Sequence, residues 1–412
     1  MPAPALTSRS AAARTVTTVR ADTAAGLLGL LPQGAELSWV RRGEGLVGWG
    51  EAARLEVTGP SALADAAAWW DEYTAGLDVA DDLAVRGSGP VVFGSIAFDP
   101  TAGTSVFVVP EVVVGRRDGV GWITTVGTAE LPPPAPVDGP APRLRYADGA
   151  LDPATWCAAV ATAVERISAG ELDKVVLARD LLVSAEPALD PRRLLRRLAD
   201  RFPDCWTFAV DGLLGATPEL LLRRDGQRLC SRVLAGTAPR GAGAEDDRLA
   251  AALLGSAKDR AEHALAVDSL VRALEPYCST LTAPAGPALL TLANVRHLAT
   301  DVIGTQHGAA GLLELVGAVH PTAAVCGTPT PDAATLIGEL EGMDRGRYAG
   351  PVGWLDARGD GEFGLALRCA ELTADGGARL FAGCGIVAGS EPAAELAETQ
   401  AKFAAFQAAL EG

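Results

Sequence analysis

The stretch "GELDKVVLARD", residues 170–180, places a lysine at the head of a run of branched apolar residues. The run predicts a buried strand, and Gly170 marks the end of the helix expected before it. The chain contains only three lysines, Lys174, Lys258 and Lys402, and its other positive side chains are arginines. Burial disfavours the charged form of a lysine, whereas an arginine stays protonated. Lys174 is therefore a candidate general base, and the alternative is a strand-end lysine whose ammonium group reaches solvent.

Helical patterns lie on both sides of this strand. Asp152 and Pro153 predict a helix start, and apolar residues follow at helical spacing as far as Ile167. A second helical region is expected over about 248–274, and a final helix begins near Ser390. The stretches "CWTFAV" and "PELLLRRD" read as strands between them. Clustered strands separated by long helices indicate an α+β chain with mainly antiparallel sheets.

The first 130 residues alternate strand-like stretches with turns. "ELSWVRRGEGLVGWGEAARLEV" predicts a hairpin around Gly43–Gly45, and "VVFGSIAF" and "TSVFVVPEVVV" predict buried strands. The proline-rich stretch 131–142 is the strongest boundary signal, and it predicts a stiff linker or a surface crossing. Residues 1–15 are expected to be a frayed N-terminus rather than a transit peptide.

Composition and charge argue against several classes of protein. The net charge of −16, with no basic stripe, argues against a nucleic-acid partner. No apolar run approaches 18 residues, so no membrane span is expected. Seven scattered cysteines without a CxxC pair indicate reduced thiols in a cytoplasmic protein, and four isolated histidines give no zinc pattern.

Two pairs of carboxylates occur at helical spacing. Asp259 and Glu262 share one helix face, and so do Glu395 and Glu398 on the last helix. If the pairs faced each other, they would form an all-oxygen site suited to Mg²⁺. The alternative is that these acids only complement the dipoles of their helix N-termini.

A single glutamate and two glycine-rich stretches complete the candidates. Glu219 lies between Pro218 and three leucines, where desolvation would raise its pKa and suit it to general acid catalysis. The alternative is an exposed glutamate on an edge strand. The stretches 234–241 and 381–390 predict turns, either as backbone nests for an anion or as ordinary hairpin turns.

Taken together and in order, ten short stretches resemble the chorismate-utilising enzymes, and most closely the isochorismate synthases. They are "GELDKVVLARD", "GATPELLL", "LAGTAPRG", "SAKDRAEH", "NVRHLATDVIG", "HPTAAVCGTP", "RGRYAGPVGW", "GDGEFGLALRCA", "AGCGIVAGS" and "EPAAELAETQAKF". The match runs from about Asp152 to the C-terminus, and "PVVFGSIAFDP" extends it loosely into the N-terminal third. The resemblance implies one domain over 16–412, with a sheet-rich part at 16–145 and the catalytic motifs at 146–412. It implies an α/β sandwich of two large, mostly antiparallel sheets, with helices outside and the active site deep between them.

The resemblance also implies a reaction and the residues that perform it. Chorismate would be isomerised to isochorismate by attack of water at C2 and loss of the C4 hydroxyl. Lys174 matches the base that activates the water, and Glu219 matches the acid that protonates the departing hydroxyl. The residues matched to a Mg²⁺ site are Glu262 and Glu398, with Asp259 and Glu395 as neighbours. Those matched to the substrate pocket are Tyr348, Arg368 and Lys402 as carboxylate ligands, Gly236, Thr237, Gly383 and Gly385 as a backbone cradle, and His297.

Single residues separate the branches of this family. Anthranilate synthases carry glutamine where Lys174 stands, and aminodeoxychorismate synthases carry a nucleophilic lysine where this chain has Ala235. Salicylate synthases share Lys174 and Glu219 and then eliminate pyruvate, so a lyase is the alternative to an isomerase. Ala323 replaces the usual proline of "HPTPAV" and is expected beside the ring pocket.

The wider role follows from the same resemblance. Isochorismate would feed menaquinone or a catechol or salicylate siderophore, and a cytoplasmic monomer is expected. A non-catalytic scaffold on the same fold is a third hypothesis, and it is disfavoured because every expected catalytic position is filled.

Overall fold

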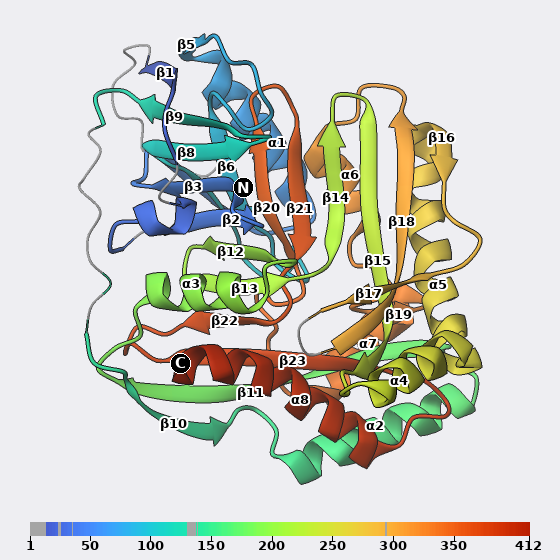
Figure 1. Ribbon diagram of the computed structural model, residues 1–412. Helices are drawn as coiled ribbons and strands as arrows, with labels where there is room; N and C mark the ends of the chain where they lie inside the picture. The colour runs from blue at the N-terminus through green and yellow to red at the C-terminus, as the bar shows by residue number, and fades with distance from the viewer. Residues whose placement is uncertain (1–13, 24–25, 35, 130–136, 138, 293–294) are drawn as a thin grey trace.

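The computed structural model describes the chain except for residues 1–13, 24–25, 35, 130–136, 138 and 293–294. Two large sheets with helices around them make up the described chain (Figure 1). Their strands pair antiparallel, apart from one parallel pair at an edge. The prediction of an α+β fold with mostly antiparallel sheets is confirmed. The expected N-terminal tail and proline-rich linker lie largely outside the described residues.

The first sheet has thirteen strands. In spatial order they are β10 (Arg143–Asp148), β11 (Lys174–Glu186), β23 (Ala378–Ile386), β22 (Cys369–Leu372), β13 (Leu213–Thr217), β12 (Trp206–Val210), β2 (Leu37–Arg41), β3 (Glu44–Trp49), β8 (Val112–Arg117), β9 (Val120–Val126), β1 (Arg14–Arg20) and β5 (Leu77–Asp81), with β19 (Gly327–Thr328) paired to β11.

The second sheet has ten strands. In order they are β16 (Cys278–Thr282), β18 (Val295–Gln306), β15 (Arg228–Pro239), β14 (Leu220–Asp225), β21 (Gly361–Leu365), β20 (Pro351–Asp356), β6 (Val91–Ser95), β7 (Ser105–Val109) and β4 (Ala53–Val57), with β17 (Ala288–Thr291) paired to β18. The helices are η1 (Leu27–Leu30), α1 (Ala62–Ala75), α2 (Pro153–Ser168), α3 (Pro191–Arg201), α4 (Ala244–Gly255), α5 (Ala257–Leu274), η2 (Glu275–Tyr277), α6 (Leu312–Val319), α7 (Thr330–Leu340) and α8 (Pro392–Glu411).

Both sheets combine the N-terminal third with the rest of the chain. In the first sheet β2 pairs with β12, so that Trp39 lies opposite Phe208. In the second sheet β6 pairs with β20, so that Phe93 lies opposite Trp354. The proline-rich stretch therefore does not separate two independent sheets.

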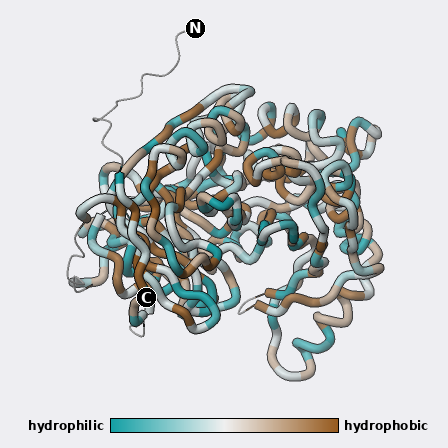
Figure 2. Tube along the Cα trace, turned by 90° about the horizontal axis from the view of Figure 1, so that it is seen from above, coloured by the Kyte–Doolittle hydropathy of each residue, from teal (hydrophilic) through white to brown (hydrophobic). Residues whose placement is uncertain are grey.

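Side chains along the strands of the first sheet pack alternately into two hydrophobic cores. Trp39 and Phe208 pack into the larger core shared with the second sheet, whereas the next residues, Val40 and Ala209, pack into a core with η1, α3 and α8. Side chains point alternately to the two faces of a strand, so one apolar strand can serve both layers. Figure 2 shows hydrophobic and hydrophilic segments interleaved along the chain. The outer helices and the two sheets thus form a layered sandwich.

Local signals at several element boundaries are confirmed. Asp152 caps α2 by accepting hydrogen bonds from the amides of Ala154 and Thr155, and Gly170 follows the helix with a φ of +80°. Arg42 and Gly43 form the two-residue turn between β2 and β3, both with positive φ. The stretch "TSVFVVPEVVV" contains two strands, β7 and β8, which belong to different sheets.

The helical region expected over 248–274 is present, and it is divided into two helices at Ser256. Helix α4 ends at Gly255, and the Ser256 hydroxyl accepts a hydrogen bond from the amide of Asp259. Glycine has low helix propensity and serine is a favoured N-cap, which explains the break. The break places Lys258, Asp259 and Glu262 in the first turns of α5.

The two glycine-rich stretches are mainly strand rather than turn. Residues 234–239 belong to β15 and residues 381–386 belong to β23. In β15 a bulge falls between Ala235 and Thr237, and Gly236 has a φ of +76°. A side chain at Gly236 would also meet the Cβ of Asp259 at 3.0 Å. Glycine is therefore required there to bring α5 close to the sheet.

One arginine of α3, Arg197, anchors the C-terminal end of α8. Arg197 donates hydrogen bonds to the carbonyls of Ala409 and Leu410, near the end of that helix.

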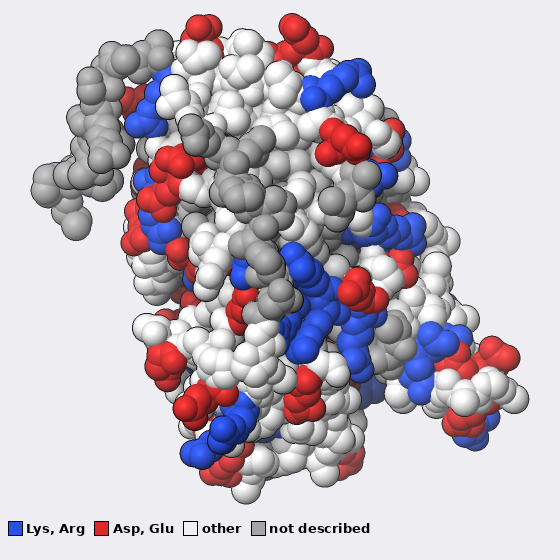
Figure 3. All heavy atoms as spheres, turned by 60° about the vertical axis from the view of Figure 1, so that its left-hand side comes forward, with Lys and Arg blue, Asp and Glu red and all other residues white. Residues whose placement is uncertain are grey.

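On the face drawn in Figure 3, Lys and Arg side chains gather in one region, with acidic side chains around them. A chain with net charge −16 thus still presents local positive charge.

No helix in the described part of the chain is long and apolar enough to cross a membrane. All seven cysteines are free thiols, four of them buried.

Candidate active site

One cavity of about 150 Å³ lies between the two sheets and the first turns of α5 and α8. β11 and β23 of the first sheet and β15 and β18 of the second all contribute to its wall. Of the fourteen candidate residues named from the sequence, thirteen line it. They are Glu219, Gly236, Thr237, Asp259, Glu262, His297, Tyr348, Arg368, Gly383, Gly385, Glu395, Glu398 and Lys402.

Lys174 is the one candidate that lies behind the cavity wall. Its Nζ is 2.8 Å from Oε1 of Glu262, and its side chain is 1% exposed. A Cβ at Gly385 would come within 2.9 Å of Lys174 Cε and within 2.8 Å of Glu262 Oε1. The alternative of a lysine that reaches solvent is therefore wrong. Glycine at 385 lets the amine and the carboxylate meet beneath β23.

All three lysines of the chain pair with carboxylates of this cluster. Besides Lys174 with Glu262, Lys402 Nζ lies 2.7 Å from Glu398 Oε1, and Lys258 Nζ lies 3.9 Å from Glu395 Oε1. The three paired glutamates lie in the N-terminal parts of α5 and α8, and each has an ammonium group nearby. A role limited to complementing helix dipoles does not explain why lysines occur only here.

The donor chemistry of the cluster fits Mg²⁺, which binds oxygen through one or two carboxylates and keeps several waters. Glu262 on α5 and Glu398 on α8 supply such a pair. Burial raises the pKa of Glu395, and the charge of Glu398 raises it further. The nearby ammonium groups therefore do not fully neutralise the carboxylates of the cluster. Within the described chain no group of three or more Asp, Glu, His or Cys side chains forms a complete ligand set. A cation here would therefore depend on few protein ligands.

Glu219 is a buried carboxyl at the junction of β13 and β14. Its residue is 6% exposed, which excludes the alternative of a solvent-facing edge-strand glutamate. Burial raises the pKa of Glu219 to about 8, although Lys174, Arg368 and Lys402 each act to lower it. The carboxyl is therefore largely protonated at neutral pH and can donate a proton inside the cavity.

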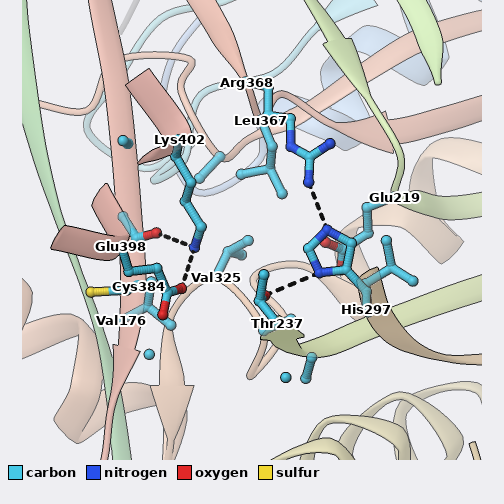
Figure 4. A pocket seen from close by; sticks show the side chains of 18 of the residues that line it. Val176, Glu219, Thr237, His297, Val325, Leu367, Arg368, Cys384, Glu398 and Lys402 are labelled. Atoms are coloured by element: carbon cyan, nitrogen blue, oxygen red, sulfur yellow. Dashed lines mark hydrogen bonds and ion pairs between the residues drawn. The ribbon is translucent and has the colours of Figure 1, made fainter. Parts of the chain in front are cut away.

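Arg368, His297 and Thr237 form a hydrogen-bonded row on the same side of the cavity (Figure 4). Burial, together with Arg368 and Lys402, lowers the pKa of His297 well below its usual value, so the ring is neutral. Arg368 Nη2 donates to His297 Nε2 at 2.6 Å, and the ring proton therefore resides on Nδ1, 3.1 Å from Thr237 Oγ1. Arg368 Nη1 is buried and has no hydrogen-bond partner among the described residues, so it is free to bind an anion.

Lys402 and Glu398 lie on the opposite side of the cavity from Arg368 and His297 (Figure 4). Burial alone would lower the pKa of Lys402, but Glu398 outweighs it and the pKa is raised, so the ammonium group is retained. Its Nζ also donates to the carbonyl of Gly383 at 2.7 Å. Cations on opposite walls suit a small ligand with two anionic groups.

Several lining residues were not predicted from the sequence. They include Lys258, Arg345 and the apolar Val176, Leu234, Val325 and Phe381. Lys258 could have been included because it is one of only three lysines. Ala323, expected beside the ring pocket, is buried and does not itself line the cavity, whereas the next residues, Ala324 and Val325, do. Phe381 stacks on Tyr348, with ring centroids 4.9 Å apart, and fixes that side chain.

Arg345 is a positioning residue beneath the cavity. Its guanidinium donates to the carbonyls of Val176 and Val325 at 2.8 and 2.9 Å, and its Nε donates to Glu341 Oε2 at 2.9 Å. Glu341 also accepts a hydrogen bond from the amide of Ala178. Arg345 and Glu341 are only 4% and 2% exposed. The pair therefore fixes two segments of the cavity wall from within the core.

Arg345→Met is expected to lower the free energy of unfolding by about 3–5 kcal/mol, because it leaves the Glu341 carboxylate buried without its partner. Urea denaturation followed by circular dichroism measures this change. Adding Glu341→Gln to the variant should restore part of the loss, since the amide oxygen can still accept from Ala178. A loss below about 1 kcal/mol in Arg345→Met would contradict the role assigned to the pair.

Comparison with known proteins matches the family model described as "Chorismate binding enzyme" to residues 136–411. The isochorismate synthase EntC of Escherichia coli is 37% identical over 332 residues, which cover 79% of this chain and 82% of EntC. The isochorismate synthase DhbC of Bacillus subtilis is 43% identical over 265 residues, covering 61% of this chain and 66% of DhbC. The structure of MenF, the menaquinone-specific isochorismate synthase of Escherichia coli, superposes with a TM-score of 0.80 at 25% identity, covering 96% and 94% of the chains.

Proposed function

The chain belongs to the chorismate binding enzymes, and on this premise we propose that it is an isochorismate synthase, an isomerase that converts chorismate to isochorismate. One observation carries the proposal: a buried carboxyl with a pKa of about 8, Glu219, faces the same cluster in which Lys174 is buried. The isomerisation needs a proton taken from water and a proton given to a departing hydroxyl. These two residues can supply both functions.

The proposed reaction conserves atoms. Lys174, as the neutral amine, takes a proton from a water molecule whose oxygen forms a bond to C2 of the ring. The ring double bonds shift and the C4–O bond breaks, while Glu219 gives its proton to the departing oxygen. One water molecule enters and one leaves, and transfer of a proton from Lys174 to Glu219 restores the starting state.

The cavity supports binding of a dianionic substrate. Lys402 and the free Nη1 of Arg368 lie on opposite walls, where each can receive one carboxylate. Neutral His297 adds no charge but keeps Arg368 oriented through the 2.6 Å hydrogen bond. The buried surroundings exclude bulk water, so the one water molecule that reacts must be bound in place.

We also propose that Glu262 and Glu398 hold Mg²⁺, with Asp259 and Glu395 nearby. When bound, Mg²⁺ would supply positive charge for a substrate carboxylate in an otherwise acidic cluster. Assignment of Glu262 to the cation has a consequence for Lys174, whose ammonium group is paired with Glu262 in the structure. With Glu262 bound to the cation, the amine of Lys174 would be released from this ion pair for its proposed role as the base.

The test is a chromatographic assay of purified protein with chorismate, with and without Mg²⁺. Isochorismate is expected to accumulate only when Mg²⁺ is present, and chelation should abolish its formation. Salicylate with stoichiometric pyruvate would contradict the isomerase assignment and favour a lyase. Turnover that is unchanged after chelation would contradict the metal proposal alone.

The pathway and setting are proposed from weaker support. Relatives include a menaquinone-specific enzyme, and we propose that the product feeds menaquinone or a siderophore. The seven free thiols support a cytoplasmic location. We propose a monomer, because the sequence shows no long amphipathic stretch suited to an interface.

A further inference from the structure

Lys258 stands apart from the other two lysines of the cluster. It lies in the first turn of α5, and its Nζ is 3.9 Å from Glu395 Oε1 in the first turn of α8. Its side chain is 50% exposed, whereas that of Lys174 is 1% exposed. Lys402 is held by a second contact, the carbonyl of Gly383. No hydrogen bond of Lys258 occurs among those of the described residues, so Lys258 is the least constrained of the three cations.

The pair that Lys258 forms spans the two helices that supply the carboxylates. Glu395 is buried, and its carboxylate is close enough to Glu398 for the two charges to repel. An ammonium group nearby reduces that repulsion as long as no other cation is bound. Because Lys258 has a long, half-exposed side chain, it can move into solvent at little cost in packing.

We propose that Lys258 is the displaceable counter-ion of the carboxylate cluster and sets its affinity for Mg²⁺. It compensates Glu395 when no divalent ion is bound, and it withdraws from Glu395 when Mg²⁺ enters. The inference rests on the Mg²⁺ site of the proposed function and adds a residue that competes with the ion. Lys258 in this role lowers the affinity for Mg²⁺ and stabilises the protein in its absence.

The size of the effect follows from Coulomb's law. Two unit charges 4 Å apart interact by about 1 kcal/mol in bulk water and by about 4 kcal/mol at an effective dielectric constant of 20. Half-exposure places the Lys258–Glu395 interaction toward the weaker limit, and binding of Mg²⁺ must displace this interaction. Removal of its charge is therefore expected to tighten Mg²⁺ binding by about tenfold.

Isothermal titration of Mg²⁺ into the purified full chain tests the proposal without any substrate. Lys258→Met should bind Mg²⁺ about tenfold more tightly than the wild type. Arg260→Met is the matched control, because Arg260 is exposed in the same helix turn, does not line the cavity and carries the same charge. This control should change the dissociation constant by less than about twofold, as expected for a screened surface charge.

Thermal unfolding gives a second readout. Without Mg²⁺, Lys258→Met should unfold at a lower temperature than the wild type, and saturating Mg²⁺ should remove the difference. An unchanged or weaker affinity in Lys258→Met, an equal gain in Arg260→Met, or no Mg²⁺ binding by the wild type would each overturn the inference. Because neither measurement involves chorismate, failure of the proposed enzymatic function would appear separately, in the turnover assay.

Discussion

Replacing Glu219 with glutamine is expected to reduce the turnover of chorismate by roughly 10²- to 10⁴-fold while leaving the protein folded, the range typical of a lost general acid. Glutamine has nearly the same shape as a protonated glutamic acid, and Glu219 is largely protonated at neutral pH because burial raises its pKa to about 8. The substitution therefore removes the transferable proton without introducing or removing a charge. Steady-state kinetics with chorismate measure the loss.

The pH dependence separates this catalytic role from a structural one. The folded pKa of Glu219 lies above the unfolded value of 4.5, so its contribution to stability is fully present below pH 4.5 and is lost as the pH rises through about 8. Wild-type turnover should likewise fall above pH 8, where the acid is ionised. Glu219→Gln should unfold at about the same urea concentration as the wild type near pH 4, and at an increasingly higher one as the pH rises to 9. Near-normal turnover in this folded variant would refute the acid role.

Local sequence signals predicted which residue types form the site better than they predicted how the strands and helices bring those residues together. Residue types that suit a proton donor, a base and an oxygen-ligand site could be selected from short stretches, whereas His297, Tyr348, Arg368 and Lys402 were assigned through the family resemblance. Thirteen of the fourteen residues selected in these two ways line one cavity. Asp152, Gly170 and the start of α8 were also readable, because capping and turn residues act within a few positions of the chain. These inferences needed no knowledge of distant pairing.

Features that depend on distant parts of the chain could not be predicted. The glycine-rich stretches resembled turns, but each pairs with strands far away, such as β15 with β18 and β23 with β11. Arg345 looked like one of many arginines, and its burial against Glu341 and two wall carbonyls depends on tertiary packing. The same holds for Lys174, whose position behind Gly385 follows from the register of β11 and β23.

Replacing Lys174 is expected to cause the second large loss of turnover, again roughly 10²- to 10⁴-fold. Lys174→Met keeps most of the aliphatic stem in its buried position and removes the amine that we propose as the acceptor of the proton of water. The loss of the 2.8 Å contact leaves Glu262 facing the cavity, where water or Mg²⁺ can compensate it. Steady-state turnover and calorimetric Mg²⁺ binding should therefore diverge, with turnover lost and metal binding retained.

Lys174→Arg distinguishes a base from a counter-ion. Arginine keeps the positive charge and can pair with Glu262, but it stays protonated at any pH at which the protein is folded. If Lys174 acts as the base, Lys174→Arg should be as inactive as Lys174→Met, even where thermal unfolding shows a stable fold. If Lys174 only balances the charge of Glu262, Lys174→Arg should retain most of the wild-type turnover, and the base role would have to be given up.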